Sequence, residues 1–136
     1  MRSEKLEVGT KGVDGMITSY KDLEVYKESY TLTILVHKMT QKYPEYERYE
    51  IGSQFRRAAM SIPMNIAEGY GKKESEMDFK RFLRMSLGSC NEVAVLLDMS
   101  SDLGYISQEE YKEITQRYEV LGKRISTLIQ KWKSNL

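Results

Sequence analysis

The chain has 136 residues, of which 40% are hydrophobic and 30% are charged, and its formal net charge is +1. This length favours one domain with a single core, and the near-neutral total means that nucleic-acid binding must be argued from how the charges are distributed. A single cysteine excludes an internal disulfide framework, and the lack of a long apolar run or a signal-peptide pattern predicts a cytoplasmic protein with no membrane span.

Residues 1–18 are rich in glycine and show no periodicity, so we predict a disordered leader followed by one domain over 19–134. The first helix is expected to begin near Ser19, whose spacing to Asp22 resembles a capping box, and to stop at Pro44. Its apolar residues form two adjoining stripes: Leu23, Tyr26, Tyr30 and Ile34, and Val25, Leu32, Val36 and Met39. Such width predicts that the helix is covered on more than one side.

The second helix is predicted over 51–70 and contains "SIPMNIAEGY". Pro63 lacks an amide donor and crowds the carbonyl of Ala59, which predicts a kink near Ser61. The Ser61 hydroxyl is expected to bond to a carbonyl one turn earlier. We further expect polar side chains of this helix to meet others on the third helix in a layer that fixes register. The predicted layer consists of Arg57, Ser61, Asn65, Glu68, Ser89 and Glu92.

The third and fourth helices are predicted over about 75–103 and from Ser107 onward. Ser75 is a helix N-cap candidate, and "SQEE" from Ser107 to Glu110 matches a capping box. Inward positions step by three and four residues in both: Phe79, Leu83, Ser86, Cys90, Val93 and Leu97, then Ile114, Tyr118, Leu121, Ile125, Leu128 and Trp132. Four amphipathic helices with short connections predict an all-α, antiparallel up-down-up-down four-helix bundle.

Signals for catalysis and metal binding are weak. The only histidine, His37, has no glutamate three residues before it, which argues against a di-iron site. Cys90 has apolar neighbours, which raise a thiol pKa instead of lowering it. The stretch "GYGKK" over 69–73 lacks the preceding strand and the spacing of a nucleotide-binding phosphate loop. We therefore expect no enzyme activity, cofactor or metal.

Basic residues gather around the junction of the second and third helices and near the C-terminal end. Cations near a helix N-terminus can bind phosphate, whereas solvated charges interrupted by Glu74, Glu76 and Asp78 are the plainer alternative. Arg117, Arg124 and Lys131 recur every seven residues, a pattern that often pairs with acids on a neighbouring helix. The candidate nucleic-acid-binding residues are Arg56, Arg57, Lys72, Lys73, Lys80, Arg81, Arg84, Lys123 and Arg124.

Four stretches together resemble the signature blocks of a known bacterial four-helix-bundle family. They are "DLEVYKESYTL" (22–32), "QFRRAAMSIPMNIAEGYGKK" (54–73), "FKRFLRMSLGSCNEV" (79–93) and "DLGYIS" (102–107). The family is known as the 23S rRNA intervening-sequence or S23-like protein family, and it includes the accessory variability determinant of diversity-generating retroelements. The resemblance implies a homopentameric barrel without catalytic activity and, in the accessory-determinant branch, binding of nucleic acid and a reverse transcriptase.

Two functions remain open at this point. The first is a non-enzymatic homo-oligomeric adaptor that binds RNA or DNA, with a reverse transcriptase as a candidate partner. The alternative is a protein-interaction scaffold encoded in or near rRNA genes, without direct nucleic-acid binding. In both cases the extra apolar width of the first helix, together with the seam of the fourth that ends at Trp132, predicts subunit contacts through these two helices.

Overall fold

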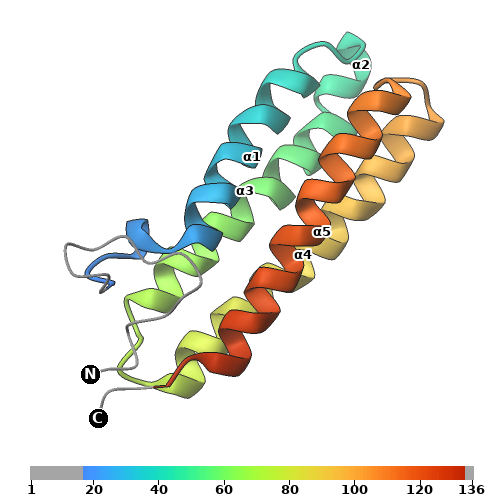
Figure 1. The fold of residues 1–136 in the computed structure, drawn as a ribbon. Coiled ribbons are helices and arrows are strands. Elements are labelled where there is room, and N and C mark those ends of the chain that lie inside the picture. Colours follow the sequence, from blue (N-terminus) through green and yellow to red (C-terminus); the bar gives the residue numbers. More distant parts are fainter. Residues whose placement is uncertain (1–16, 134–136) are drawn as a thin grey trace.

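The computed structural model describes residues 17–133, and within them it contains helices and turns but no strand. The elements in chain order are a 3₁₀ helix η1 (Tyr20–Asp22), α1 (Glu24–Thr40), α2 (Glu45–Arg48), α3 (Ile51–Tyr70), α4 (Glu76–Asp102) and α5 (Gln108–Lys131). The four long helices run up, down, up and down (Figure 1). This arrangement confirms the all-α class and fits a four-helix bundle. The predicted leader lies outside the described residues over 1–16.

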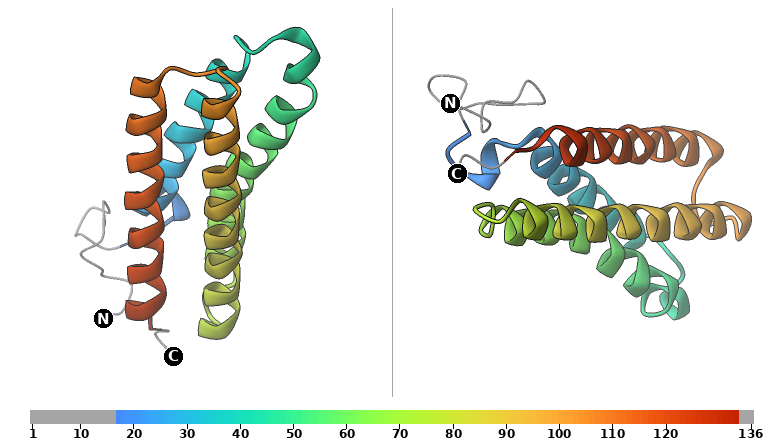
Figure 2. Two further views of the ribbon diagram at one scale, coloured as in Figure 1. Left: turned by 90° about the vertical axis from the view of Figure 1, so that its right-hand side faces the viewer. Right: turned by 90° about the horizontal axis from the view of Figure 1, so that it is seen from below.

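The most extensive contacts join α3 to α4, and further large contacts join α1 to α3 and α4 to α5. By contrast, α1 and α5 touch only slightly, so the bundle is least closed on that side (Figures 1 and 2). The turn between α3 and α4 lies at the same end of the bundle as η1 and the end of α5 (Figure 1). We call this end the α3–α4 end, and the opposite one the α2 end.

The core consists of the inward positions that the periodicity predicts. All six on α4 and all six from Ile114 to Trp132 are buried, which confirms both seams. Trp132 follows α5, is 1% exposed, and packs edge to face against Phe79 with ring centroids 4.8 Å apart. The ring of Trp132, where the predicted seam ends, is enclosed by its own chain, whereas the predicted subunit contacts through the first and fourth helices stay a prediction.

The helix boundaries follow the predictions with two corrections at the N-terminal side. The Ser19 capping box is present but opens η1, and α1 begins only at Glu24. The first helix ends at Thr40, before Pro44, which stands at the N-cap of the short α2. Ile17, placed in the predicted leader, is buried, so the domain extends to at least this residue. The bounds of α3 match the prediction, and Ser75 and Ser107 cap α4 and α5 as expected.

Pro63 lies inside α3, and a side chain of α1 compensates for its missing amide. An N–H at position 63 would bond to the carbonyl of Ala59, one turn earlier. Instead, the buried Thr33 hydroxyl donates to this carbonyl at 3.0 Å and also lies 2.7 Å from the carbonyl oxygen of Ser29 in its own helix. The carbonyl that Pro63 leaves without an amide donor thus forms a specific hydrogen bond between α1 and α3.

Two further side chains donate to carbonyls of the same turn. The buried Ser86 hydroxyl of α4 donates to the carbonyl of Ile62 at 3.0 Å, and Asn65 Nδ2 donates to the carbonyl of Ser61 at 2.8 Å. The Ser86 bond attaches this turn of α3 to α4, as the Thr33 bond attaches it to α1, and the Asn65 bond lies within α3, which continues without interruption through its proline.

We predict that Thr33→Val lowers the free energy of unfolding by about 1–3 kcal/mol, because the buried Ala59 carbonyl loses its donor. In a Pro63→Ala background the restored backbone amide serves this carbonyl, so the same substitution should cost clearly less. Urea unfolding of the four proteins of this double-mutant cycle measures the difference. An equal cost in both backgrounds would contradict the role assigned to Thr33.

Candidate nucleic-acid interface

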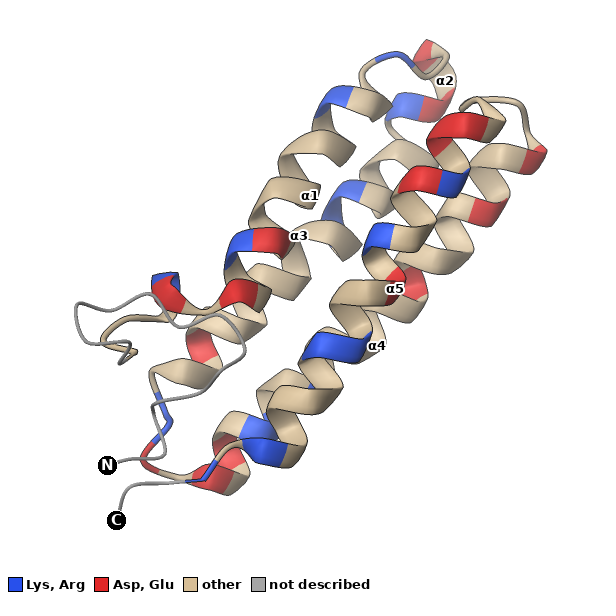
Figure 3. Cartoon of the chain, in the orientation of Figure 1, with Lys and Arg blue, Asp and Glu red and all other residues tan. Residues whose placement is uncertain are grey.

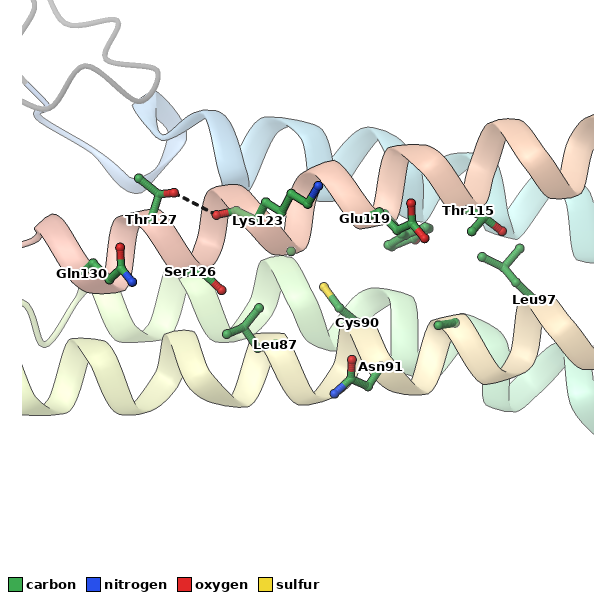
Figure 4. A pocket seen from close by; sticks show the side chains of 13 residues that line it. Leu87, Cys90, Asn91, Leu97, Thr115, Glu119, Lys123, Ser126, Thr127 and Gln130 are labelled. Atoms are coloured by element: carbon green, nitrogen blue, oxygen red, sulfur yellow. Dashed lines mark hydrogen bonds between the residues drawn. The ribbon is translucent and has the colours of Figure 1, made fainter.

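A groove of about 830 Å³ runs between α4 and α5 (Figure 4). Leu87 and Cys90 point from α4 toward α5, and Ser126 points back toward α4. Small residues such as Ala94 and Gly122 line it, and their short side chains leave space between the two helices. The polar side chains that line it are Asn91, Thr115, Glu119, Lys123, Ser126, Thr127 and Gln130. These donors and acceptors can bind an extended polar ligand without any single deep pocket.

The antiparallel packing of α4 and α5 gathers cations at the α3–α4 end. The first half of α4 lies beside the second half of α5, so residues 72–84 and 123–133 come together (Figure 3). These two segments carry nine Lys and Arg residues and only three acidic residues, Glu74, Glu76 and Asp78. Lys80 and Arg84 precede Leu87 by seven and three residues, a helical spacing that places them on the groove side of α4.

Some of these cations already have partners. Lys80 Nζ lies 2.8 Å from Glu76 Oε2, and the Arg81 guanidinium lies 4.6 Å from the centroid of the Phe82 ring. Lys73 Nζ lies 5.2 Å from the centroid of the Tyr70 ring. These three side chains contribute positive potential, but each would have to give up its present contact in order to bind a ligand directly.

Five of the predicted residues are exposed and form no ion pair with any described residue: Arg57 on α3, and Lys72, Arg84, Lys123 and Arg124. The last four lie just before α4, on α4 and on α5, around the basic end of the groove. We call these four residues the basic cluster. They are the exposed, unpaired candidates that lie together at one end of the bundle.

Arg56 and Arg57 do not join this cluster. Arg56 donates through Nη1 to the Thr40 hydroxyl and through Nη2 to the Arg48 carbonyl, both at 2.9 Å. Arg56 thereby connects α1, α2 and α3 at the α2 end. The sequence predicts a nucleic-acid contact for this residue, whereas the structure gives its guanidinium two partners within the chain. Arg57 is exposed on α3.

Arg117 is also engaged in a contact between helices. Its Nε donates to Glu28 Oε2 at 3.1 Å and joins α5 to α1, as the seven-residue basic repeat predicts for charges that flank a helix seam.

The predicted polar layer is only partly assembled by hydrogen bonds. The Ser61 hydroxyl bonds to the Ser89 hydroxyl across α3 and α4, not to a carbonyl of its own helix as expected, and Asn65 Nδ2 donates to Ser61 Oγ at 3.2 Å. The other three members, Arg57, Glu68 and Glu92, are exposed and form no hydrogen bond with a described residue. The role of the layer in fixing register stays a prediction.

The buried cysteine is poorly suited to nucleophilic chemistry. Burial raises the pKa of the Cys90 thiol to about 12, so little thiolate exists near neutral pH. The neighbouring Tyr118 is also buried, which raises the pKa of its hydroxyl. Within residues 17–133, no three His, Cys, Asp or Glu side chains cluster as metal ligands, and no helix is long and apolar enough to cross a membrane.

Sequence reasoning missed the polar walls of the α4–α5 groove, chiefly Asn91, Ser126 and Gln130. The sequence did contain a signal for this groove. Asn91, Ser126 and Gln130 stand next to the apolar seams, at positions where long aliphatic side chains would cover the junction of α4 and α5. It also missed Thr33, whose role depends on a carbonyl 26 residues away in the chain.

Comparisons with known proteins agree with this architecture. The structure is similar to a crystal structure from Bacteroides thetaiotaomicron VPI-5482, described as a protein of unknown function from the S23 ribosomal protein family, with a TM-score of 0.71 and 22% identity over 78% of this chain and 95% of that one. A search of curated proteins finds no match. The model of the 23S rRNA-intervening sequence protein family matches residues 21–127, which cover all but the ends of the helical domain. The chain therefore belongs to the 23S rRNA-intervening sequence protein family.

Proposed function

We propose that the protein is a non-enzymatic, homo-oligomeric adaptor that binds the sugar-phosphate backbone of RNA or DNA at the basic end of the α4–α5 groove. The observation that carries this proposal is the basic cluster, four exposed cations without an ion-pair partner in the described part of the chain. Such groups bind phosphate by releasing counterions, which requires no base-specific contact. Because the total charge is near neutral, this attraction depends on the local excess of cations at the α3–α4 end.

The local chemistry suits a nucleic-acid backbone better than a small anion. The cations are spread over α5 and the start of α4, and the groove between them offers amide and hydroxyl donors, including Asn91 and Ser126. Lys72 precedes the N-terminus of α4, where the helix dipole also favours an anion. A ligand with several phosphates in a row can use these groups together, which favours affinity over sequence preference.

We predict that Lys123→Ala combined with Arg124→Ala reduces the slope of log K against log salt by about 2, because two phosphate contacts are lost. Fluorescence anisotropy between low and physiological salt, with labelled single-stranded RNA, duplex DNA and an RNA–DNA hybrid, measures this slope. The matched control is Lys38→Ala with Lys42→Ala, which removes the same charge from two exposed positions, one in the last turn of α1 and one just after it, toward the α2 end.

Two results would overturn the nucleic-acid part of the proposal. One is the absence of binding to all three probes at low salt. The other is an equal loss of slope in the α5 variant and in the α1 control, because that would show a response to net charge and not to the basic cluster.

Self-association and a protein partner complete the proposal. The resemblance of the signature blocks supports a homopentamer, and the exposed Tyr30 and Ile34 of α1 support the expectation that α1 takes part in subunit contacts. Light scattering of the purified protein tests this against the 15.9 kDa mass of one chain. For the reverse transcriptase, support comes from the resemblance alone, and co-purification of the two proteins in the presence of nuclease is the test.

A protein-interaction scaffold is the second candidate, and a specific surface favours it. An apolar groove of about 360 Å³ between α1 and α3 is lined in part by Tyr30, Ile34, Met60 and Met64, all of them exposed. Methionine and tyrosine suit adaptable protein contacts. Partner capture that survives nuclease digestion, together with no binding of the nucleic-acid probes, would favour the scaffold over the adaptor.

A further inference from the structure

The α2 end of the bundle is acidic, in contrast to the α3–α4 end. Residues 44–54 and 88–113 come together there, and they carry nine Asp and Glu residues and only two basic residues, Arg48 and Lys112 (Figure 3). The near-neutral total charge is thus the sum of two ends of opposite sign. A local excess of carboxylates attracts cationic groups, just as the opposite end attracts phosphates.

An apolar groove of about 400 Å³ lies between α3 and α4 at this end. Its lining includes Val95, Met99 and Leu103, which follow one another at four-residue intervals and are 55%, 46% and 52% exposed. We call these three residues the α4 ridge. At 1.5 Å per residue the ridge is about 12 Å long, and its contiguous apolar side chains are more than a solvated helix face needs. The groove therefore offers an apolar surface that its own chain does not cover.

Carboxylates border the α4 ridge on the side of α3, and no described Lys or Arg lines the groove. Glu50 and Glu92 line it, are exposed, and form no ion pair with a described residue. Glu47 also lines it, and its Oε2 accepts a hydrogen bond from the Tyr105 hydroxyl at 2.6 Å. Arg57, two turns after Glu50, is not among the lining residues. This side of the ridge is therefore negative.

Two further carboxylates border the ridge on the side of α5. Asp98 Oδ1 accepts a hydrogen bond from the Tyr111 hydroxyl of α5 at 2.6 Å, and Asp102 stands one turn later on the same side of α4. Both are exposed. A tyrosine donor leaves the carboxylate its charge, so Asp98 still attracts a cation. The apolar ridge thus has acids on both sides.

We propose that this groove binds a basic amphipathic helix of another protein. Apolar side chains on one face of that helix cover the α4 ridge, and Lys or Arg side chains on both of its flanks meet the bordering carboxylates. Docking of a helix into a groove needs apolar anchors at helical spacing, and complementary charge beside them selects the partner. Methionine adapts to side chains of different shape, so Met99 suits this surface.

A second copy of this chain fits the groove less well than another protein does. Among the cations at the α3–α4 end of such a copy, Lys80 already pairs with Glu76, and Arg81 lies 3.7 Å from Asp78. The four cations of the basic cluster are spread over α5 and the start of α4, not along both flanks of one apolar ridge. The subunit contacts expected from α1 and α5 also leave the groove between α3 and α4 accessible.

The inference goes beyond the proposed nucleic-acid site, because the groove and the basic cluster lie at opposite ends of the bundle. Partner binding is therefore measured on the full chain without nucleic acid. Either site can fail while the other stands, since no residue of the basic cluster lines this groove.

The first test addresses charge. The probe is a fluorescein-labelled helical peptide of alanine, leucine, lysine and arginine, with the leucines on one face, and its acidic counterpart carries glutamate in place of every lysine and arginine. Anisotropy should show that the basic peptide binds and the acidic one does not. Glu50→Gln with Glu92→Gln should weaken binding about 10-fold, because two carboxylates at the groove are lost. The matched control, Glu109→Gln with Glu113→Gln, removes the same charge from exposed positions of α5 at the same end and should leave the affinity nearly unchanged.

The second test addresses the α4 ridge. Val95→Ala with Met99→Ala should also weaken binding of the basic peptide about 10-fold, because both side chains lose apolar area that the peptide covers. Met77→Ala with Met85→Ala is the control, since it truncates exposed methionines in the first half of the same helix and should have no effect. Thermal unfolding followed by circular dichroism verifies that all four variants stay folded.

Several results would overturn the proposal: no binding of the basic peptide to the wild-type protein, equal binding of the acidic peptide, or equal losses in the groove variants and their controls. Sedimentation velocity without peptide adds one more. If Glu50→Gln with Glu92→Gln abolishes self-association, the occupant of the groove is a second copy and not another protein. Anisotropy with labelled RNA should be unchanged in the groove variants, so a failure here leaves the nucleic-acid proposal in place.

Discussion

Replacing Trp132 with alanine is expected to lower the free energy of unfolding by about 3–5 kcal/mol, the range for truncation of a buried aromatic residue. The ring is 1% exposed and packs edge to face on Phe79 and on Tyr70, with centroids 4.8 and 6.2 Å away. It therefore attaches the end of α5 to the α3–α4 end of the core. Urea unfolding followed by circular dichroism measures the loss.

Two companion variants make this result specific. Trp132→Phe keeps an aromatic ring and removes an indole N–H that has no hydrogen-bond partner within the described residues, so it should cost less than half as much. Lys133→Ala changes the exposed next residue and should stay within about 0.5 kcal/mol of wild type. A loss below about 1 kcal/mol for Trp132→Ala would show that the C-terminal side of α5 is not part of the cooperative core.

Gly69→Ala should lower the free energy of unfolding by about 1–3 kcal/mol, although alanine has a helix propensity about 1 kcal/mol better than that of glycine. A Cβ at Gly69 would lie 2.6 Å from Cβ of Phe82 and 3.1 Å from Cδ1 of Phe79. Since Phe82 Cβ is attached directly to the α4 backbone, α3 and α4 would have to move apart. Thermal unfolding in a calorimeter measures the change.

Gly122→Ala is the matched control for this substitution. Its Cβ would meet only Leu87 Cδ2, at 4.0 Å, which is an ordinary contact. The propensity gain should then appear as a stabilisation of about 0.5–1 kcal/mol. The explanation fails if the two substitutions shift the midpoint in the same direction by similar amounts.

The helices were predictable because their signals are local. Ser75 and Ser107 cap α4 and α5 through bonds to amides three residues ahead, and the apolar steps of three and four residues reflect the helical repeat. The bounds of α3 follow from the same kind of pattern, even with Pro63 inside it. The first helix was placed less accurately, since η1 intervenes between the Ser19 cap and Glu24.

The candidate site was predictable only in part. Lys72, Arg84, Lys123 and Arg124 were recognised as cations, but their grouping depends on the antiparallel pairing of α4 with α5. Arg56 is just as basic in the sequence and yet serves as a tie at the α2 end. A residue's charge is a property of the chain, whereas its availability depends on which partners the fold brings within reach.

Helix type, helix ends, the buried seams and the family membership follow from the amino-acid sequence, because caps, periodicity and signature blocks involve residues that are near one another in the chain. Tertiary packing decided the rest. It enclosed Trp132, gave the Ala59 carbonyl a donor from Thr33 and gathered the basic cluster. These outcomes depend on which helices become neighbours and at which level they meet, and that is settled by long-range contacts that no single segment encodes.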